Sequence, residues 1–131
     1  MSAFSELNIA GSGLTMHQRW LDNLSDNIAN VNTVRGTDQA AFQARFTSAR
    51  AVAGGGVVVG PESLGDPVGR VTYSPDHPLA DAEGYVRMPD IDMASQMSQL
   101  VIAQRGFQAQ ATVVKNAQDT YASALSIGRG A

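Results

Sequence analysis

The sequence has no cysteine and little charge for its 131 residues. Without cysteine the chain can form no disulfide and offers no thiolate for zinc binding or nucleophilic chemistry. Charged residues make up 16% of the sequence, whereas soluble globular domains contain about 25%. This deficit indicates a surface that is covered largely by neighbouring chains. The net charge is -3 and Lys115 is the one lysine, so the sequence predicts no surface for nucleic acid.

Long apolar runs are absent as well. No stretch approaches the roughly 18 consecutive apolar residues of a membrane span, so we expect no membrane insertion. The first residues lack a basic segment followed by an apolar segment and a small-residue cleavage site, so we expect no cleaved secretory signal. If the protein leaves the cytoplasm, we expect a route that recognises an uncleaved signal.

Apolar residues instead recur every seven positions near both ends of the chain. Two rows occur in each terminal segment, and the spacing between them alternates between three and four residues. The rows are Leu7, Leu14, Leu21 and Ile28 with Ala10, His17, Leu24 and Val31, then Met93, Leu100, Phe107, Val114 and Tyr121 with Met97, Ala111 and Leu125. This spacing is typical of helices that pair along a narrow apolar seam. The sequence therefore predicts two coiled-coil helices whose seams are assembly interfaces.

The first helix is expected from about Phe4 to Val31, within a helical arm of residues 1–34. Gly11 and Gly13 lie inside it, and each costs about 1 kcal/mol relative to alanine. Three asparagines and a glycine mark the predicted end, because these residue types tolerate the left-handed conformation that closes a helix. They are Asn27, Asn30, Asn32 and Gly36.

Residues 35–89 carry short alternating runs broken by Gly, Pro and Asp, which predict a small β-rich domain. We expect about four short strands, over 42–46, 57–59, 71–73 and 85–88. Alternation would place Phe42, Ala44 and Phe46 on one face of the first strand. The glycine triplet at 54–56 predicts a mobile loop.

The second helix is expected within residues 90–131, beginning after Asp90 or Asp92 and ending at Ile127 before Gly128. The fold class is therefore α+β: long terminal helices form a coiled-coil core with a small β domain between them. From Met93 to Ile127 the only charged residues are Arg105, Lys115 and Asp119.

An exposed helix of this length normally carries many charge pairs. The scarcity of charge indicates that other helices surround the second helix. Gln104 and Gln118 fall on the predicted seam, where neutral polar residues can fix register and partner. An ordinary hairpin of the two helices within one chain is the alternative to assembly, and the pattern alone leaves both open.

Catalytic and metal-binding chemistry is not indicated. The candidates are His17, His77 with Asp76 and Asp81, the carboxylates Asp90 and Asp92, and the segment Gly11-Ser12-Gly13. His17 falls on a helix seam, His77 lies in a proline-rich turn, and the two carboxylates suit a helix N-terminus. The glycine segment lacks the rest of any phosphate-binding motif. We therefore expect no enzyme activity, cofactor, metal or small-molecule substrate.

Three motifs resemble a known family. Residues 25–33 are similar to the asparagine-rich end of the first helix in bacterial flagellar rod and hook proteins, residues 77–92 resemble the C-type proximal rod protein (the FlgC family), and residues 105–110 resemble the family's Arg-x-aromatic-Gln-Ala pattern. Asp26 stands where serine is usual in the family, and Gly106 is unusual inside the last helix. The residues that carry the resemblance are Asn27, Asn30, Asn32, Pro78, Leu79, Gly84, Tyr85, Pro89 and Gln108.

The resemblance implies a structural subunit of the flagellar basal-body rod, the shaft that transmits torque. Its helices would pack with other copies and other rod proteins, with the MS ring and export gate at the rod base. The family is exported by the flagellar type III apparatus to the periplasmic rod, and Phe42 and Phe46 match a Phe-x-x-x-apolar element that the gate recognises in relatives. A helical type III export chaperone or adaptor is the alternative from another class.

Overall fold

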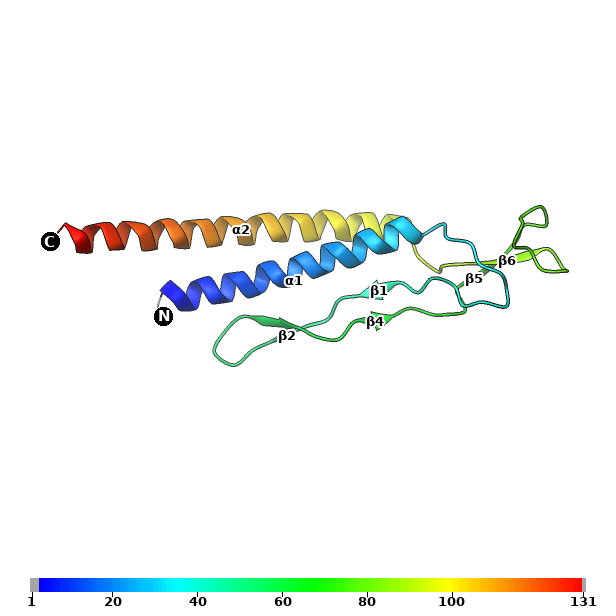
Figure 1. Ribbon diagram of the computed structural model, residues 1–131, viewed down its shortest axis with the longest axis horizontal. Coiled ribbons are helices and arrows are strands. Elements are labelled where there is room, and N and C mark those ends of the chain that lie inside the picture. The colour runs from blue at the N-terminus through cyan, green and yellow to red at the C-terminus, as the bar shows by residue number, and fades with distance from the viewer. Residues whose placement is uncertain (1–2, 131) are drawn as a thin grey trace.

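The computed structural model describes residues 3–130 and is elongated (Figure 1). Helix α1 spans Ala3–Asn30 and helix α2 spans Met93–Arg129. The two helices run antiparallel and pack along each other, and the last turns of α2 extend past the first turn of α1. Six short strands lie between them in the sequence. The predicted α+β fold with paired terminal helices is confirmed.

Helix α2 begins directly after Asp92, one of the two aspartates at which its start was predicted. The carboxylate of Asp92 accepts a hydrogen bond from the backbone N–H of Ser95 at 3.1 Å, which satisfies an otherwise free donor of the first turn. The predicted stop at Gly128 is wrong, because the helix continues to Arg129 and Gly130 caps it. Gly128 does not adopt a positive φ, so it does not close the helix.

Helix α1 ends at Asn30, but the predicted reason is wrong. No residue other than glycine has a positive φ within 3–130, so the asparagines are not there for left-handed geometry. The Asn30 side chain instead donates to the Asp26 backbone carbonyl at 2.9 Å and accepts from the Thr33 hydroxyl at 3.1 Å. These contacts hold the last turn of the helix and the residues that leave it.

The strands form three two-stranded antiparallel sheets. Strands β1 (Arg45–Phe46) and β4 (Ser63–Leu64) pair, as do β2 (Ala49–Ala51) and β3 (Val57–Val59), and together they form one long ribbon. Strands β5 (Arg70–Tyr73) and β6 (Tyr85–Met88) form a separate hairpin at the end of the molecule away from the termini (Figure 1). The strands predicted near 57–59, 71–73 and 85–88 are confirmed.

The first predicted strand is wrong in extent. Only Arg45 and Phe46 are in β1, so Phe42 and Ala44 lie outside any strand. Ala44 is buried and Phe42 is half-buried, whereas 46% of Phe46 is exposed. The three residues therefore do not share one buried face.

The glycine triplet forms the tight turn of the ribbon against α1. All three glycines have positive φ, which side chains rarely tolerate. A Cβ on Gly55 would lie 2.7 Å from Cδ1 of Ile9, and one on Gly56 would lie 2.7 Å from the hydroxyl of Ser12. The triplet thus lets the turn approach the helix closely, where the sequence predicted a mobile loop.

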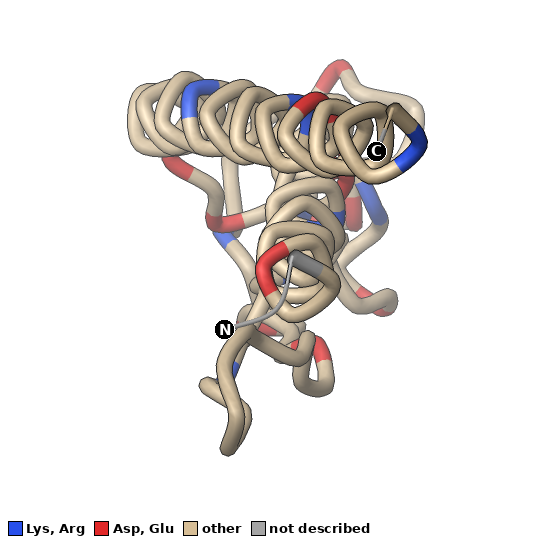
Figure 2. The backbone as a smooth tube through the Cα atoms, turned by 90° about the vertical axis from the view of Figure 1, so that its left-hand side faces the viewer, with Lys and Arg blue, Asp and Glu red and all other residues tan. Residues whose placement is uncertain are grey.

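The elements form three layers, α2, α1 and the ribbon, and α1 lies in the middle (Figure 2). Few apolar side chains are fully buried in the described residues, and most of them are small. They are Ala10, Leu24, Ala41, Ala44, Val86, Pro89 and Ala103. With so small an apolar core, the polar contacts between the layers carry much of the specificity of the fold.

Candidate assembly site

The inner faces of the two helices contain most of the predicted heptad residues. On α1 and just beyond it, none of the predicted row is exposed: Leu24 is buried and Leu7, Leu14, Leu21, Ile28 and Val31 are half-buried. On α2, Leu100, Phe107, Val114 and Tyr121 are half-buried. The rings of Phe4 and Tyr121 meet edge to face with centroids 5.4 Å apart. These rows therefore pair the helices within one chain.

The companion row on α2 differs from the predicted one. Met97 and Leu125 are 53% and 51% exposed, and Ala111 is exposed too. The inner companion row lies instead four residues before the main row and consists of Gln96, Ala103, Gln110 and Ala117. Gln104 and Gln118, predicted on the seam, are exposed. Small and amide side chains give no apolar signal, which is why the sevenfold pattern does not indicate this inner row.

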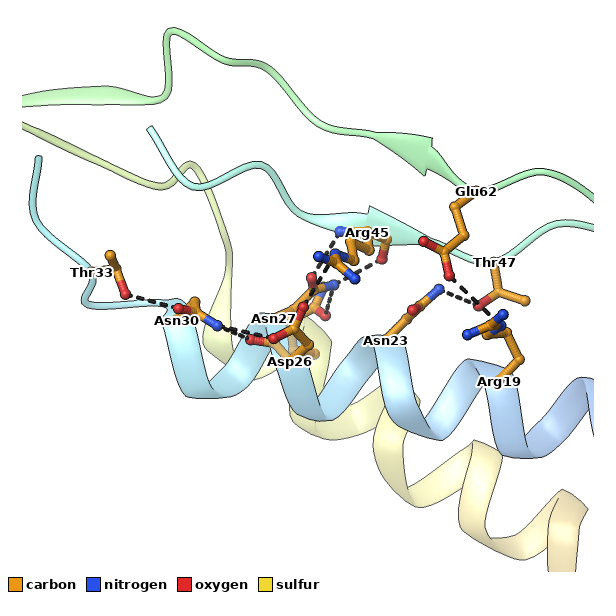
Figure 3. Close-up of polar contacts among 10 residues, drawn as sticks. Arg19, Asn23, Asp26, Asn27, Asn30, Thr33, Arg45, Thr47 and Glu62 are labelled. Atoms are coloured by element: carbon orange, nitrogen blue, oxygen red, sulfur yellow. Dashed lines mark hydrogen bonds and ion pairs between the residues drawn. The ribbon is translucent and has the colours of Figure 1, made fainter. Parts of the chain in front are cut away.

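Asn27 joins all three layers (Figure 3). It is 1% exposed, and its amide nitrogen donates to the backbone carbonyl of Arg45 and to Oε1 of Gln96, both at 3.0 Å. Its amide oxygen accepts from the backbone N–H of Arg45 at 2.8 Å. The side chain thus pairs with β1 as a neighbouring strand would, while it also contacts α2.

Further polar contacts attach the ribbon along α1 (Figure 3). Asn23 donates to the Thr47 hydroxyl at 2.9 Å, and Arg19 lies 3.7 Å from the carboxylate of Glu62. Nearer the N-terminus, the Ser12 hydroxyl accepts from the backbone N–H of Val57 at 3.0 Å. Together with Asn27, these side chains form a polar stripe along one face of the helix. We call Ser12, Arg19, Asn23 and Asn27 the ribbon-binding stripe.

The motif of residues 77–92 forms the turn that follows β5, strand β6 and the segment that leads to α2. The Asp81 carboxylate accepts from the backbone N–H of Tyr85 at 2.8 Å and from the Thr37 hydroxyl at 2.8 Å. The hydrogen bond from the Tyr85 backbone, followed by that from Thr37, holds the pKa of Asp81 below its ordinary value. Gly84 turns the chain with φ of 85°, and a Cβ there would lie 2.9 Å from the Tyr73 ring.

The other motif residues divide between the interior and the surface. Gly84 and Pro89 are buried, whereas Asn32, Pro78, Leu79, Tyr85 and Gln108 are exposed. His77 accepts the backbone N–H of Leu79 at Nδ1, at 3.1 Å, so it shapes its turn as expected. His17 packs against α2. Within residues 3–130 no group of three or more His, Asp or Glu is placed to hold a metal ion.

The outer faces of α2 carry exposed apolar side chains. They are Met93, Met97, Val101, Ile102, Leu125 and Ile127, whereas the exposed Val113 lies at the edge of the groove that α2 forms with Ile9 and Ala10 of α1. Two ion pairs occur among the described residues, Arg19–Glu62 and Arg45–Asp26, and neither includes α2. None of the described helices is long and apolar enough for a membrane span. An apolar, almost uncharged helix surface of this extent is typical of protein–protein interfaces.

The fold and these exposed surfaces define an elongated, helix-paired subunit built for assembly. Two family models match the chain: "Flagella basal body rod protein" over residues 7–35, and "Flagellar basal body rod FlgEFG protein C-terminal" over residues 82–127. Both matches fall mainly on the two helices.

Curated relatives match almost the whole chain. The flagellar basal-body rod protein FlgC of Yersinia enterocolitica is 33% identical over 135 residues, covering 98% of this chain and all of the relative. The FlgC of Escherichia coli O6:H1 is 31% identical over 134 residues, with the same coverage. That of Borreliella burgdorferi is 30% identical over 152 residues, covering 99% of this chain and all of the relative.

This chain belongs to the FlgC family of flagellar basal-body rod proteins, and it is a structural subunit of the rod. The predicted family is confirmed, and the export-chaperone alternative is not favoured. The sequence pattern does not predict which groups the asparagine side chains bind, above all Gln96 and the backbone of Arg45. The run of asparagines does mark a functional segment, but the asparagines act through side-chain hydrogen bonds and not through left-handed backbone geometry.

Proposed function

We propose that the subunit joins its neighbours in the rod through the outer faces of α2, while the inner rows hold α1 and α2 together. The observation that carries this proposal is the exposure of large apolar side chains on α2, including Ile102 at 59% and Ile127 at 75%. Burying such side chains against neighbouring helices contributes about 25 cal/mol per Å² of apolar area. Rod assembly would supply that burial.

The predicted interface residues then have two roles. Met93, Met97 and Leu125 are exposed on α2 and would contact neighbouring subunits directly. The remaining heptad residues would act indirectly, since they set the shape of the helix pair that the neighbours meet.

Membership of the rod-protein family supports the proposed partners and location. A rod protein assembles with other flagellar rod components, and we propose that this one meets copies of itself, other rod proteins, and MS-ring and export-gate parts at the rod base. We also propose that it acts in the periplasm without enzymatic activity. Its task would be to transmit torque through packed helices.

A charged substitution on the outer face tests this proposal. Ile102→Asp is expected to abolish motility and rod-containing basal bodies, because a carboxylate cannot be buried unpaired between helices. The purified variant should unfold like the parent, since exposed substitutions usually change stability by less than about 0.5 kcal/mol.

Two control variants define the outcome. Ile102→Leu keeps the apolar face and should keep motility. Val68→Asp adds the same charge at another exposed apolar residue, away from the helices, and should assemble. Normal motility in cells that carry only Ile102→Asp would refute the role of this face.

For export, we propose that Phe42 and Phe46 form the element recognised by the type III gate. Phe46 is exposed to 46% and Phe42 is half-buried, so neither phenylalanine is needed to fill the buried core of the fold. An unfolded chain can be recognised only through short linear elements such as this pair.

The combined variant Phe42→Ala, Phe46→Ala is expected to lower secretion several-fold in cells whose rod is blocked from assembling. In that background folding outside the cell no longer affects the amount secreted. Val58→Ala, at an exposed apolar residue of the same ribbon, is the matched control. Equal secretion of the parent and the double variant would assign both phenylalanines to the fold alone.

A further inference from the structure

Four glycines lie inside the two helices, and they have opposite surroundings. A Cβ added to Gly11 or Gly128 would meet nothing within 4 Å. A Cβ added to Gly13 or Gly106 would meet a side chain of the opposite helix. The first pair could carry a side chain freely, whereas a side chain at either glycine of the second pair would press against the opposite helix.

Gly106 of α2 accommodates the ring of His17 from α1. A Cβ on Gly106 would overlap this ring, lying 2.5 Å from Cδ2. The ring has little freedom to move away, because its Nδ1–H donates to the backbone carbonyl of Gly13 at 2.9 Å. The glycine that is unusual for the family's last helix therefore has a steric reason.

Gly13 of α1 accommodates Gln110 of α2 in the reciprocal way. A Cβ on Gly13 would lie 3.0 Å from both Cδ and Nε2 of the Gln110 side chain. Gly13 is buried, and Gln110 is half-buried. Each helix thus places one polar side chain over a glycine of the other. We call His17–Gly106 and Gln110–Gly13 the register contacts.

The register contacts agree on a single alignment of the helices. His17 lies four residues after Gly13 in α1, and Gly106 lies four residues before Gln110 in α2. The buried Asn27–Gln96 hydrogen bond lies ten residues further in the same antiparallel alignment. Three polar contacts along the helix pair therefore specify one axial offset.

The apolar rows cannot specify that offset by themselves. Because they repeat every seven residues, a slide of seven positions would again place apolar residues opposite apolar residues. Such a slide would bring His17 opposite Gln99 or Val113 instead of Gly106. Neither residue leaves room for the ring, so the glycine contacts exclude the slide.

We propose that the register contacts set the axial offset between α1 and α2, and so fix how far the last turns of α2 extend beyond α1. A slide of seven residues would move that extension by about 10 Å. The extension carries the exposed residues Leu125 and Ile127. His17 and Gln110 are therefore positioning residues for whatever surface α2 presents. This inference depends on the pairing of the helices within one chain and not on the proposed use of α2 in the rod.

Alanine substitutions at the four glycines test the steric part. Helix propensity alone predicts that all four raise Tm, because alanine is the better helix former. The proposal predicts that Gly106→Ala lowers Tm by several degrees, that Gly13→Ala lowers it less because the Gln110 side chain can bend away, and that Gly11→Ala and Gly128→Ala raise it. A Tm for Gly106→Ala as high as that of Gly128→Ala would overturn the proposal.

Spin labels measure the offset directly. The chain has no native cysteine, so cysteines introduced at the exposed positions Asn8 and Ala111 can be labelled selectively. The parent should give one narrow distance distribution, and Gly106→Ala should shift or broaden it. The double variant His17→Ala, Gly106→Ala should return both the distribution and Tm toward the parent, because the added methyl group then has room and the Gln110–Gly13 and Asn27–Gln96 contacts still specify the offset.

The double variant also separates register from simple misfolding. If Gly106→Ala unfolds the protein, recovery in the double variant still supports the proposal. An unchanged distance distribution in a folded Gly106→Ala, or no recovery in the double variant, would show that the glycines serve local packing and not register.

Discussion

Replacing Asn27 by leucine is expected to lower the free energy of unfolding by about 3–4 kcal/mol. Leucine is similar in size, so little cavity forms. The loss comes from the groups left behind: the backbone N–H and carbonyl of Arg45 and the amide of Gln96 would lose their partners. An unpaired buried polar group costs about 1–3 kcal/mol, and the partly buried backbone of Arg45 regains some hydration.

Chemical denaturation followed by circular dichroism measures this effect. Asn32 is the matched control, because it is an exposed asparagine of the same motif. Asn32→Leu should change stability by less than about 0.5 kcal/mol. A loss below about 1 kcal/mol for Asn27→Leu would mean that the ribbon is held to α1 by other contacts.

Phe107→Asp is expected to separate the two helices and to prevent incorporation into the rod. Phe107 is half-buried on the inner row of α2, where with Leu14 it lines a groove between the helices. Truncating a buried aromatic costs about 3–5 kcal/mol, and an unpaired carboxylate adds a desolvation cost. The variant protein should therefore lose helix pairing before it meets any neighbour.

The contrast with Ile102→Asp makes this prediction specific. Both variants should abolish motility, but only Phe107→Asp should lower the stability of the purified subunit. Phe107→Leu keeps an apolar side chain, so it should retain both motility and the stability of the purified subunit. If Phe107→Asp unfolds at the same denaturant concentration as the parent, the inner row does not hold the helix pair.

Both helices could be predicted from sequence because their signal is periodic and local. The sevenfold spacing and the cap at Asp92 depend on residues close in the chain, and the structure confirms the two helices and the cap. The end of α2 at Arg129 could not be predicted from Gly128 alone. A glycine ends a helix when its φ becomes positive, and that depends on the residues around it.

The ribbon and the inner companion row needed information from distant residues. Strand β1 is held by the side chain of Asn27, which is 18 residues earlier in the chain. The partner of Asn27 on α2 is 69 residues away. Hydropathy does not distinguish a glutamine that meets a buried asparagine from one that meets water. For this reason the pattern does not indicate Gln96 and Gln110, and it places Gln104 and Gln118 on the seam instead.

A density map of the assembled basal body, at a resolution that shows side chains, is the most direct test of the central claim. We predict that α1 and α2 of one chain stay paired in the rod, with Asn27 against Gln96 and His17 over Gly106. We also predict that helices of neighbouring subunits cover Val101 and Ile102. Helix pairs formed between different chains, or an outer face of α2 left open to solvent, would contradict it.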